Sequence, residues 1–444
     1  MPLKCGGKGT PTFVRCVPQV QVGAGTPFAE GLTLMRRFAL SGLAVCFVLL
    51  GTAPAQAAAA SVRQVYAPMW MTDFVKQEPC LMTVAAPAAA DENCIPWTRR
   101  ENAAPTLDEA TGRLYLGGSD GKLHSISARD GTHVFRVDLP GFLQSKPTLS
   151  QSALYFGTSE GRVLRVAASD GEIGWNVQVD AEVLEPVVVH EETIYAVTGL
   201  ETIYAIDKNN GEIRWLQKHP LPTGITLRGQ AKPLVVKQPK SEGMQTSVYV
   251  GHSDGQLSVL DGETGQVLDV LSLAAGEGFL DVDADPILHG GQIIAASHGQ
   301  GVFAIHAADM RSAWRYDEPG IVRLASGGPQ RVIAAGAGKV IGLDSRTGEE
   351  RWRFTFPKGA PTRPVVKGGR VHIGSDRGAL YILDAYSGEP LQYFGSSLGF
   401  AAEPELHADG LFVVSVPGTL FALSNAHPGN IAPRALPRRP KLNP

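Results

Sequence analysis

The chain has 444 residues, of which 43% are hydrophobic and 19% are charged, and its formal net charge is −3 at pH 7. This composition is typical of a globular protein and excludes a chain that is disordered along its whole length. Without residues 1–57 there are 35 Lys and Arg against 42 Asp and Glu, a net charge of −7, which disfavours a nucleic-acid-binding surface.

The first element in chain order is a secretory signal peptide, predicted at residues 35–57. It has two arginines, an apolar run over residues 38–50, and small residues at Ala55 and Ala57 before a cleavage site. The apolar run is too short to span a bilayer comfortably. We therefore predict export from the cytoplasm, with residues 1–34 either not translated or disordered.

The signal peptide also contains a sequence that resembles a lipoprotein box, at residues 43–46. Val45 is too large for the position before a lipidated cysteine, and Cys46 lies inside the apolar run rather than at its end. A lipid anchor is therefore not expected.

Only two cysteines follow the signal peptide, Cys80 and Cys94. An even pair in an oxidising compartment predicts a disulfide bond. It would close a loop of roughly 15 residues and contribute about 3 kcal/mol in the chain-entropy model.

From residue 114 onward one glycine-containing phrase recurs eight times. The copies are 39 to 54 residues apart and begin at Leu114, Leu154, Ile194, Val248, Ile293, Val332, Val371 and Leu411. A period in this range indicates an array of small units that bury one another. Asp-Gly, Asn-Gly and Thr-Gly turns between short β-rich runs indicate hairpins, because glycine adopts positive φ at little steric cost.

Proline precedes the strands of seven units, and four units place a tryptophan after the second turn. Proline fits at the start of a strand because it has no N–H to donate within a sheet. Four strands in each of eight units predict an all-β fold, an eight-bladed β-propeller of four-stranded antiparallel blades over residues 58–424, with the blades at about 105–424. The residues predicted to dock one blade on the next are Trp175, Trp215, Trp314 and Trp352.

The last unit stops near Ser424, before its own tryptophan strand. We predict that residues 65–75 supply this strand, with Trp70 as the tryptophan equivalent, so that the N-terminus closes the ring. A chain that begins at residue 100 is then expected to be insoluble or far less stable. Residues 425–444 are rich in proline and arginine and are predicted to be disordered, the alternative being a weak contact with an anionic surface.

Several motifs resemble catalytic or metal-binding sequences. Gly-x-Ser-x-Gly occurs at residues 117–121, 157–161 and 251–255, always at the same repeat position and between two strands, whereas a nucleophile elbow needs a strand and a helix. Asp281, Asp283 and Asp285 imitate the opening of a calcium loop, but proline occupies the position that needs glycine. The histidines have no metal-ligand spacing. We predict no catalytic site, no metal and no cofactor.

The repeat resembles the pyrroloquinoline-quinone-type propeller, which is shared by enzymes and non-enzymes. The quinone-dependent alcohol dehydrogenases use adjacent cysteines, and this chain has no Cys-Cys pair. Two segments resemble the BamB family of the outer-membrane β-barrel assembly machinery: residues 224–233 are similar to its L-S-L-R-G-x-x-x-P stretch, and residues 279–286 to its L-S-D-V-D-x-x-P stretch.

The resemblance implies a periplasmic scaffold, peripheral to the outer membrane, that is not an enzyme. Its partners would be the POTRA region of a BamA-like barrel subunit and nascent outer-membrane proteins. By position, Ile225 and Leu227 would be apolar anchors, Arg228 a charged anchor, and Asp281 and Asp283 acidic partners. In the purely structural alternative, Leu227 packs under the blade and Arg228 pairs with Asp281 or Asp283. The alternative function is a quinone-dependent dehydrogenase or quinone-binding sensor.

Overall fold

The computed structural model describes residues 65–75, 101–222, 226, 230–240, 243–276, 278–396 and 398–426. The predicted signal peptide, the pair Cys80 and Cys94, and the C-terminal segment from residue 427 lie outside the described residues. No helix in the described part of the chain is long and apolar enough to cross a membrane.

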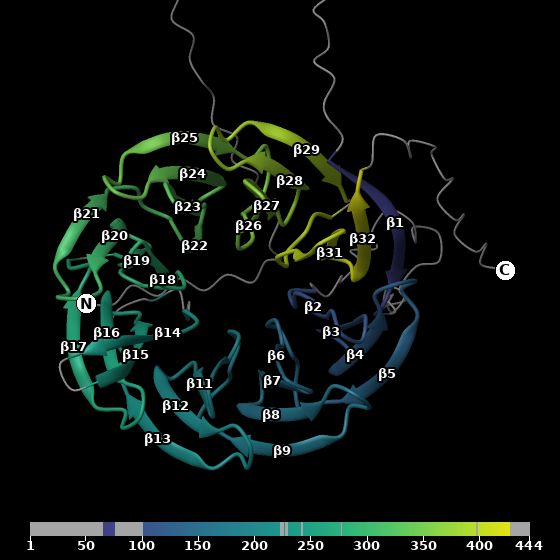
Figure 1. The fold of residues 1–444 in the computed structure, drawn as a ribbon, viewed down its shortest axis with the longest axis horizontal. Helices are drawn as coiled ribbons and strands as arrows, with labels where there is room; N and C mark the ends of the chain where they lie inside the picture. Colours follow the sequence, from purple (N-terminus) through teal and green to yellow (C-terminus); the bar gives the residue numbers. More distant parts are fainter. Residues whose placement is uncertain are drawn as a thin grey trace, which may run out of the picture. The chain divides into compact units, whose positions relative to one another are not determined.

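The described strands form eight antiparallel sheets of four strands, arranged as the blades of a ring in chain order (Figure 1). Blade 1 consists of β2 (Thr106–Asp108), β3 (Arg113–Gly117), β4 (Lys122–Ser127) and β5 (His133–Asp138), and blade 2 of β6 (Thr148–Ser150), β7 (Ala153–Gly157), β8 (Arg162–Ala167) and β9 (Ile173–Gln178). Blade 3 consists of β10 (Val188–His190), β11 (Thr193–Val197), β12 (Thr202–Asp207) and β13 (Ile213–Lys218), and blade 4 of β14 (Leu234–Lys240), β15 (Gly243–Gly251), β16 (Gln256–Asp261) and β17 (Val267–Ser272).

Blades 5 to 7 consist of β18 (Ile287–His289), β19 (Gln292–Ser297), β20 (Gly301–His306) and β21 (Ser312–Tyr316); β22 (Arg323–Ser326), β23 (Arg331–Gly336), β24 (Lys339–Asp344) and β25 (Glu350–Thr355); β26 (Val365–Lys367), β27 (Arg370–Gly374), β28 (Ala379–Asp384) and β29 (Pro390–Gly395). Blade 8 combines β30 (Glu405–His407), β31 (Gly410–Val414) and β32 (Thr419–Asn425) with β1 (Tyr66–Asp73) from the other end of the chain. The predicted all-β, eight-bladed fold is confirmed.

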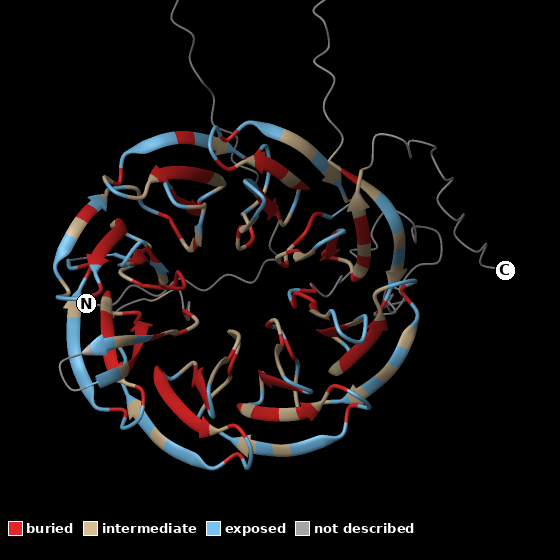
Figure 2. Ribbon diagram, in the orientation of Figure 1, coloured by how far each residue is buried: buried red, intermediate tan, exposed pale blue. Residues whose placement is uncertain are grey.

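How far a strand is buried depends on its position in the blade (Figure 2). The second and third strands are buried on both faces between neighbouring blades, and all five residues of β11 are buried. The outermost strand alternates instead, as in β13, where the half-buried Trp215 and Gln217 are flanked by exposed residues. The hydrophobic core is therefore a circular layer between the blades, and no blade has a core of its own.

Tryptophan docks one blade on the next, as blades 2 and 3 show. The indole N–H of Trp175 on β9 donates to the carbonyl of Lys208, at 3.1 Å. Its ring lies over Gly211, where a Cβ would approach the ring to 2.9 Å, and Gly211 has a φ of +78°. Glycine is thus needed both for the turn conformation and for the space that the indole takes.

The same contact recurs around the ring. The tryptophans Trp70, Trp215, Trp314 and Trp352 lie over Gly131, Gly265, Gly348 and Gly388, and their N–H groups donate to the carbonyls of Ala128, Gly262, Ser345 and Ala385. In blade 1, Phe135 takes the tryptophan position and packs on Gly171.

The N-terminal strand closes the ring. β1 pairs antiparallel with β32, with a bulge between Pro68 and Trp70, and the two strands lie side by side in Figure 1. Gln392 on β29 anchors the start of β1: its Oε1 accepts hydrogen bonds from the N–H groups of Val65 and Tyr66, at 2.7 and 2.8 Å. The prediction that an N-terminal strand closes the ring is confirmed.

Replacing Trp70 by Ala should lower the free energy of unfolding by about 3 kcal/mol, because it removes the indole that joins blade 8 to blade 1. The matched control is Met69→Ala on the same strand, where the side chain is 56% exposed and the change should stay within about 0.5 kcal/mol. Urea unfolding measures both. Equal stability of the two variants would contradict closure through Trp70.

Candidate functional site

Charged residues occupy one repeated position, directly before the proline that opens a blade. The position is charged before six blades, and all six residues form ion pairs with other blades: Lys146, Glu185, Lys232, Asp285, Arg363 and Glu403. The innermost strands β6, β10, β14, β18, β26 and β30 begin just after these residues and surround the axis in Figure 1. We call Glu185, Lys232, Asp285, Arg323, Arg363 and Glu403 the axial charge cluster.

Arg363 is the centre of this cluster. Its Nη2 lies 2.7 Å from Oδ2 of Asp285 and 3.1 Å from Oε2 of Glu185, and its Nη1 lies 3.2 Å from Oε2 of Glu403. Glu185 precedes blade 3 and Arg363 precedes blade 7, which are opposite each other in a ring of eight. One guanidinium therefore joins four blades across the axis.

The charges in the cluster stabilise one another. Burial opposes ionisation of Asp285, but Arg363 and Lys232 outweigh it and lower the pKa of that carboxyl. Burial also opposes the charge on Arg363, yet Asp285, Glu403 and Glu185 together raise the pKa of its guanidinium. Burial dominates at Glu185 and raises the pKa of that carboxyl.

A cavity of about 350 Å³ adjoins the cluster. Glu185, Arg323, Arg363 and Glu403 line it, together with Lys146 and uncharged residues from the starts of neighbouring blades. Its size is within the range of small-ligand sites, but its two carboxylates, Glu185 and Glu403, already pair with Arg363. Within the described residues, no group of three or more His, Cys, Asp or Glu could hold a metal ion.

The segments before blades 4 and 5 meet beside this cluster. The N–H of Lys232 donates to Oδ1 of Asp285 at 2.8 Å, and Nζ of Lys232 lies 3.7 Å from Oδ2. Of the residues predicted to bind a partner, Ile225, Leu227 and Arg228 lie outside the described residues. The contact between Lys232 and Asp285 nevertheless joins the ends of the two segments.

Asp281 and Asp283 lie in the interior, with 0% and 6% of their surface exposed. The N–H of Val282 between them donates to the carbonyl of His252, and the N–H of His298 donates to that of Asp281. Burial raises the pKa of Asp283 to about 7, although Arg323 acts in the opposite direction. Burial favours a role in holding the loop over direct contact with a partner, and their role as acidic partners stays a prediction.

A buried network that the sequence did not indicate joins blades 3 and 4. His252 Nδ1 lies 2.8 Å from Oε2 of Glu201, and its Nε2 lies 2.9 Å from Oγ of Ser258. Burial opposes ionisation of Glu201, but hydrogen bonds from His252 and Ser253 lower the pKa of this carboxyl. Ser253 is the serine of the third Gly-x-Ser-x-Gly motif and donates to Glu201 at 2.6 Å.

This arrangement resembles a Ser-His-Glu triad in its distances but not in its surroundings. Ser258 is in the middle of the sheet on β16 and only 3% exposed, and it does not line the cavity beside the axial charge cluster. A nucleophile must reach a substrate carbonyl. The network therefore stabilises the contact between blades. Only the contacts between blades reveal it, because Glu201 and His252 are 51 residues apart.

Comparisons with known proteins agree with this architecture. A family profile described as outer membrane protein assembly factor BamB matches residues 92–178, 119–336 and 336–432. The BamB of Legionella pneumophila (strain Paris) is 27% identical over 207 residues, which cover 45% of this chain and 52% of the relative. That of Alkalilimnicola ehrlichii is 28% identical over 216 residues, with the same coverage. The match thus spans about half the length of these curated relatives.

Two solved structures show the same fold. The crystal structure of BamB from Moraxella catarrhalis has a TM-score of 0.64 at 19% identity and covers 73% of this chain and 96% of that one. A quinohemoprotein alcohol dehydrogenase from Comamonas testosteroni has a TM-score of 0.57 at 13% identity and covers 74% of each chain. At these identities the likeness shows the fold alone.

The eight blades and their tryptophan docking define a β-propeller of the pyrroloquinoline-quinone-like repeat class. Within that class, the profile match extends over nearly the whole propeller. The chain belongs to the family of the outer membrane protein assembly factor BamB, and the predicted family resemblance is confirmed.

Replacing Arg363 by Ala should lower the free energy of unfolding by about 3–5 kcal/mol at pH 7, because three carboxylates lose their shared cation. Since Arg363 holds the pKa of Asp285 below its unfolded value, this contribution is present above about pH 4 and is lost as the pH falls through the folded pKa. Urea unfolding at pH 7 and at a series of pH values below 4 tests it.

The matched control is Arg353→Ala. Arg353 also pairs with two carboxylates, Glu318 and Glu350, but its side chain is 36% exposed. Exposed pairs contribute about 1 kcal/mol or less. A loss at Arg363 no larger than at Arg353 would contradict the central role of the axial charge cluster.

Asp283→Asn should stabilise the protein in neutral and alkaline buffer. Because the folded pKa of Asp283 is about 7, the folded state binds its proton more tightly than the unfolded state, and wild-type stability falls between about pH 4 and pH 7. Asn lacks this titration, so its advantage should grow over that window to the order of 4 kcal/mol and then level off. Unfolding at pH 5 and pH 8 measures it. A pH-independent difference would refute the raised pKa.

Proposed function

We propose that the chain is a non-enzymatic periplasmic scaffold of the outer-membrane β-barrel assembly complex. It would bind the POTRA region of the barrel subunit through the segments before blades 4 and 5, and it would aid the insertion of outer-membrane proteins. Its association with this complex would hold it at the outer membrane. Family membership supports the assembly role.

The observation that carries the proposed binding site is the contact between Lys232 and Asp285. It holds the ends of two segments from consecutive blades together on a rigid ring. Loops that a scaffold fixes in this way are common binding elements. Residues 225–228 would then provide the contacts, with Ile225 and Leu227 as apolar anchors and Arg228 as the charged anchor.

In this proposal Asp281 and Asp283 act by positioning. Both are buried, and Arg323 contributes a positive charge beside Asp283. Their carboxylates would fix the second segment and orient Arg228 toward the partner. A binding hot spot needs such support, because an anchor that is free to move loses conformational entropy when it binds.

Arg228→Ala should weaken binding to the purified POTRA region by at least 2 kcal/mol, or about 30-fold, because a desolvated arginine anchor is lost. Isothermal titration calorimetry with the full mature chain measures the affinity, and circular dichroism shows whether the fold survives. The control is Arg346→Ala, which removes the same charge from an exposed turn of blade 6. Unchanged binding by a folded Arg228→Ala variant would refute this site.

A further inference from the structure

Among the described outer strands, three lack the docking tryptophan. Blade 1 has Phe135, which packs on Gly171, and blade 7 has Gln392, which binds the backbone of β1. Blade 4 has neither kind of contact with blade 5. The residue that pairs with the third strand at this position is Trp215 in blade 3 and Trp314 in blade 5, opposite Ala205 and Ala304. In blade 4 it is Asp269, opposite Val259. Asp269 is exposed and places no ring on the next blade.

The facing position on blade 5 has changed as well. The turn residue that an indole covers elsewhere is glycine at 211, 265, 348 and 388, and here it is Met310. Met310 keeps the left-handed conformation of those glycines, with a φ of +59°, and donates the same turn hydrogen bond to the carbonyl four residues before it. The backbone of this turn therefore has the same conformation as the docking turns, although Asp269 stands in place of the tryptophan and Met310 in place of the glycine.

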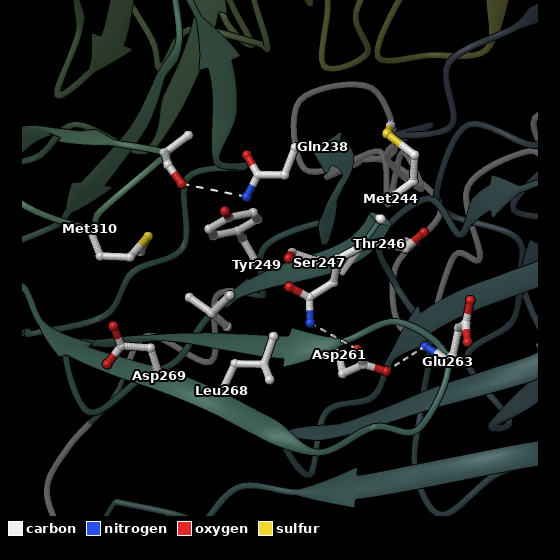
Figure 3. A pocket seen from close by; sticks show the side chains of 14 residues that line it. Gln238, Met244, Thr246, Ser247, Tyr249, Asp261, Glu263, Leu268, Asp269 and Met310 are labelled. Carbon is white, nitrogen blue, oxygen red and sulfur yellow. Dashed lines mark hydrogen bonds between the residues drawn. The ribbon is translucent and has the colours of Figure 1, made fainter. Parts of the chain in front are cut away.

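A cleft of about 490 Å³ lies where the indole would be (Figure 3). Its lining comes from blade 4, including Gln238, Thr246, Leu268 and Asp269, and from the blade 5 turn at Met310. A volume of this size is in the range of pockets that bind small ligands or side chains.

The carbonyl that receives the indole N–H is still present in this cleft. At the equivalent turn of blade 4, the carbonyl of Gly262 accepts from Trp215 at 3.1 Å and from the hydroxyl of Tyr195 at 2.9 Å. In blade 5 the equivalent carbonyl belongs to Ala307. Among the described side chains its donor is Gln238, at 3.5 Å, drawn as a dashed line in Figure 3. The acceptor can take a shorter hydrogen bond from an incoming group.

The charge of the cleft determines which residues are favoured beside the group that enters it. The lining residues include three carboxylates, those of Asp261, Glu263 and Asp269, and no lysine or arginine. Asp261 is engaged in its own turn, where it accepts from the N–H groups of Glu263 and Thr264. Glu263 and Asp269 are exposed at the mouth of the cleft. These carboxylates would therefore attract cationic groups beside an aromatic ring that enters the cleft.

The adjacent strand favours a polypeptide over a small molecule. β17 is the outer strand of blade 4, and three of its aliphatic side chains are exposed: Val267, Leu268 and Val270. It carries no lysine, arginine or proline, the residues that usually protect an edge strand from pairing with another chain. An extended segment could thus lie along β17 with one side chain in the cleft.

We propose that the cleft between blades 4 and 5 binds a tryptophan side chain of a partner polypeptide, in an extended segment with lysine or arginine beside the tryptophan. The indole takes the place that Trp175, Trp215, Trp314 and Trp352 occupy at other blade contacts, with its N–H on the carbonyl of Ala307. The basic neighbours of the tryptophan pair with Asp269 and Glu263.

The test uses the full mature chain and the peptide Lys-Trp-Lys, with 5-fluorotryptophan and blocked ends, observed by ¹⁹F NMR. Wild type should shift and broaden the fluorine signal in a saturable way. The double variant Asp269→Trp with Met310→Gly rebuilds the docking pair of the other blades, so it should fill the cleft, raise the melting temperature and weaken peptide binding at least about tenfold.

Asp269→Lys is a second variant at an exposed position, so it should fold normally, and it should also weaken binding at least about tenfold through charge reversal. The control peptides Lys-Ala-Lys and Glu-Trp-Glu should bind more weakly than Lys-Trp-Lys. Absence of a saturable signal with wild type would overturn the proposal, as would full binding by the filled double variant. The barrel subunit takes no part in this test, so its result is independent of the site around Arg228.

Discussion

The contact between a tryptophan of one blade and a turn glycine of the next is the constraint on which the ring depends. Each blade is too thin to bury its own apolar side chains, so its two faces are covered by its neighbours. The indole over Gly211, Gly265, Gly348 or Gly388 fixes the distance and the angle between two blades, because its N–H must also reach a backbone carbonyl. The ring closes only if every blade has a neighbour on both faces, and β1 supplies the last strand.

Closure places charged side chains from distant parts of the chain at the axis. Arg363 meets Glu185 from the opposite side of the ring, and it also pairs with Asp285 and Glu403. This cluster stiffens the inner end of the ring and anchors the segments before blades 4 and 5. The segments proposed to bind a partner end near the axis, at Lys232 and Asp285, and the tryptophan cleft of the same two blades lies beside the outer strand β17.

The fold and the family could be predicted from the sequence, whereas the pairs formed by distant charged residues could not. The repeat period, the turn glycines and four tryptophans indicated eight blades, and the unit truncated near Ser424 indicated an N-terminal closing strand. The sequence pattern also showed a charged residue before several of the blade prolines, but the pairs could not be assigned, since Glu185 and Arg363 are 178 residues apart. Several histidines are buried, which their spacing did not indicate, and His252 bridges two blades.

The sequence by itself determined the number of blades and the strands within them, because these follow from local turn chemistry and from a period that repeats along the chain. The family was indicated by the resemblance of residues 224–233 and 279–286 to two stretches of the BamB family. Only the tertiary structure decided which charges pair across the axis, that Asp281 and Asp283 face inward, and that the exchange of Trp for Asp269 and of Gly for Met310 leaves one cleft. The physical reason is that burial and pairing depend on neighbours in space, and ring closure brings together residues that no local pattern connects.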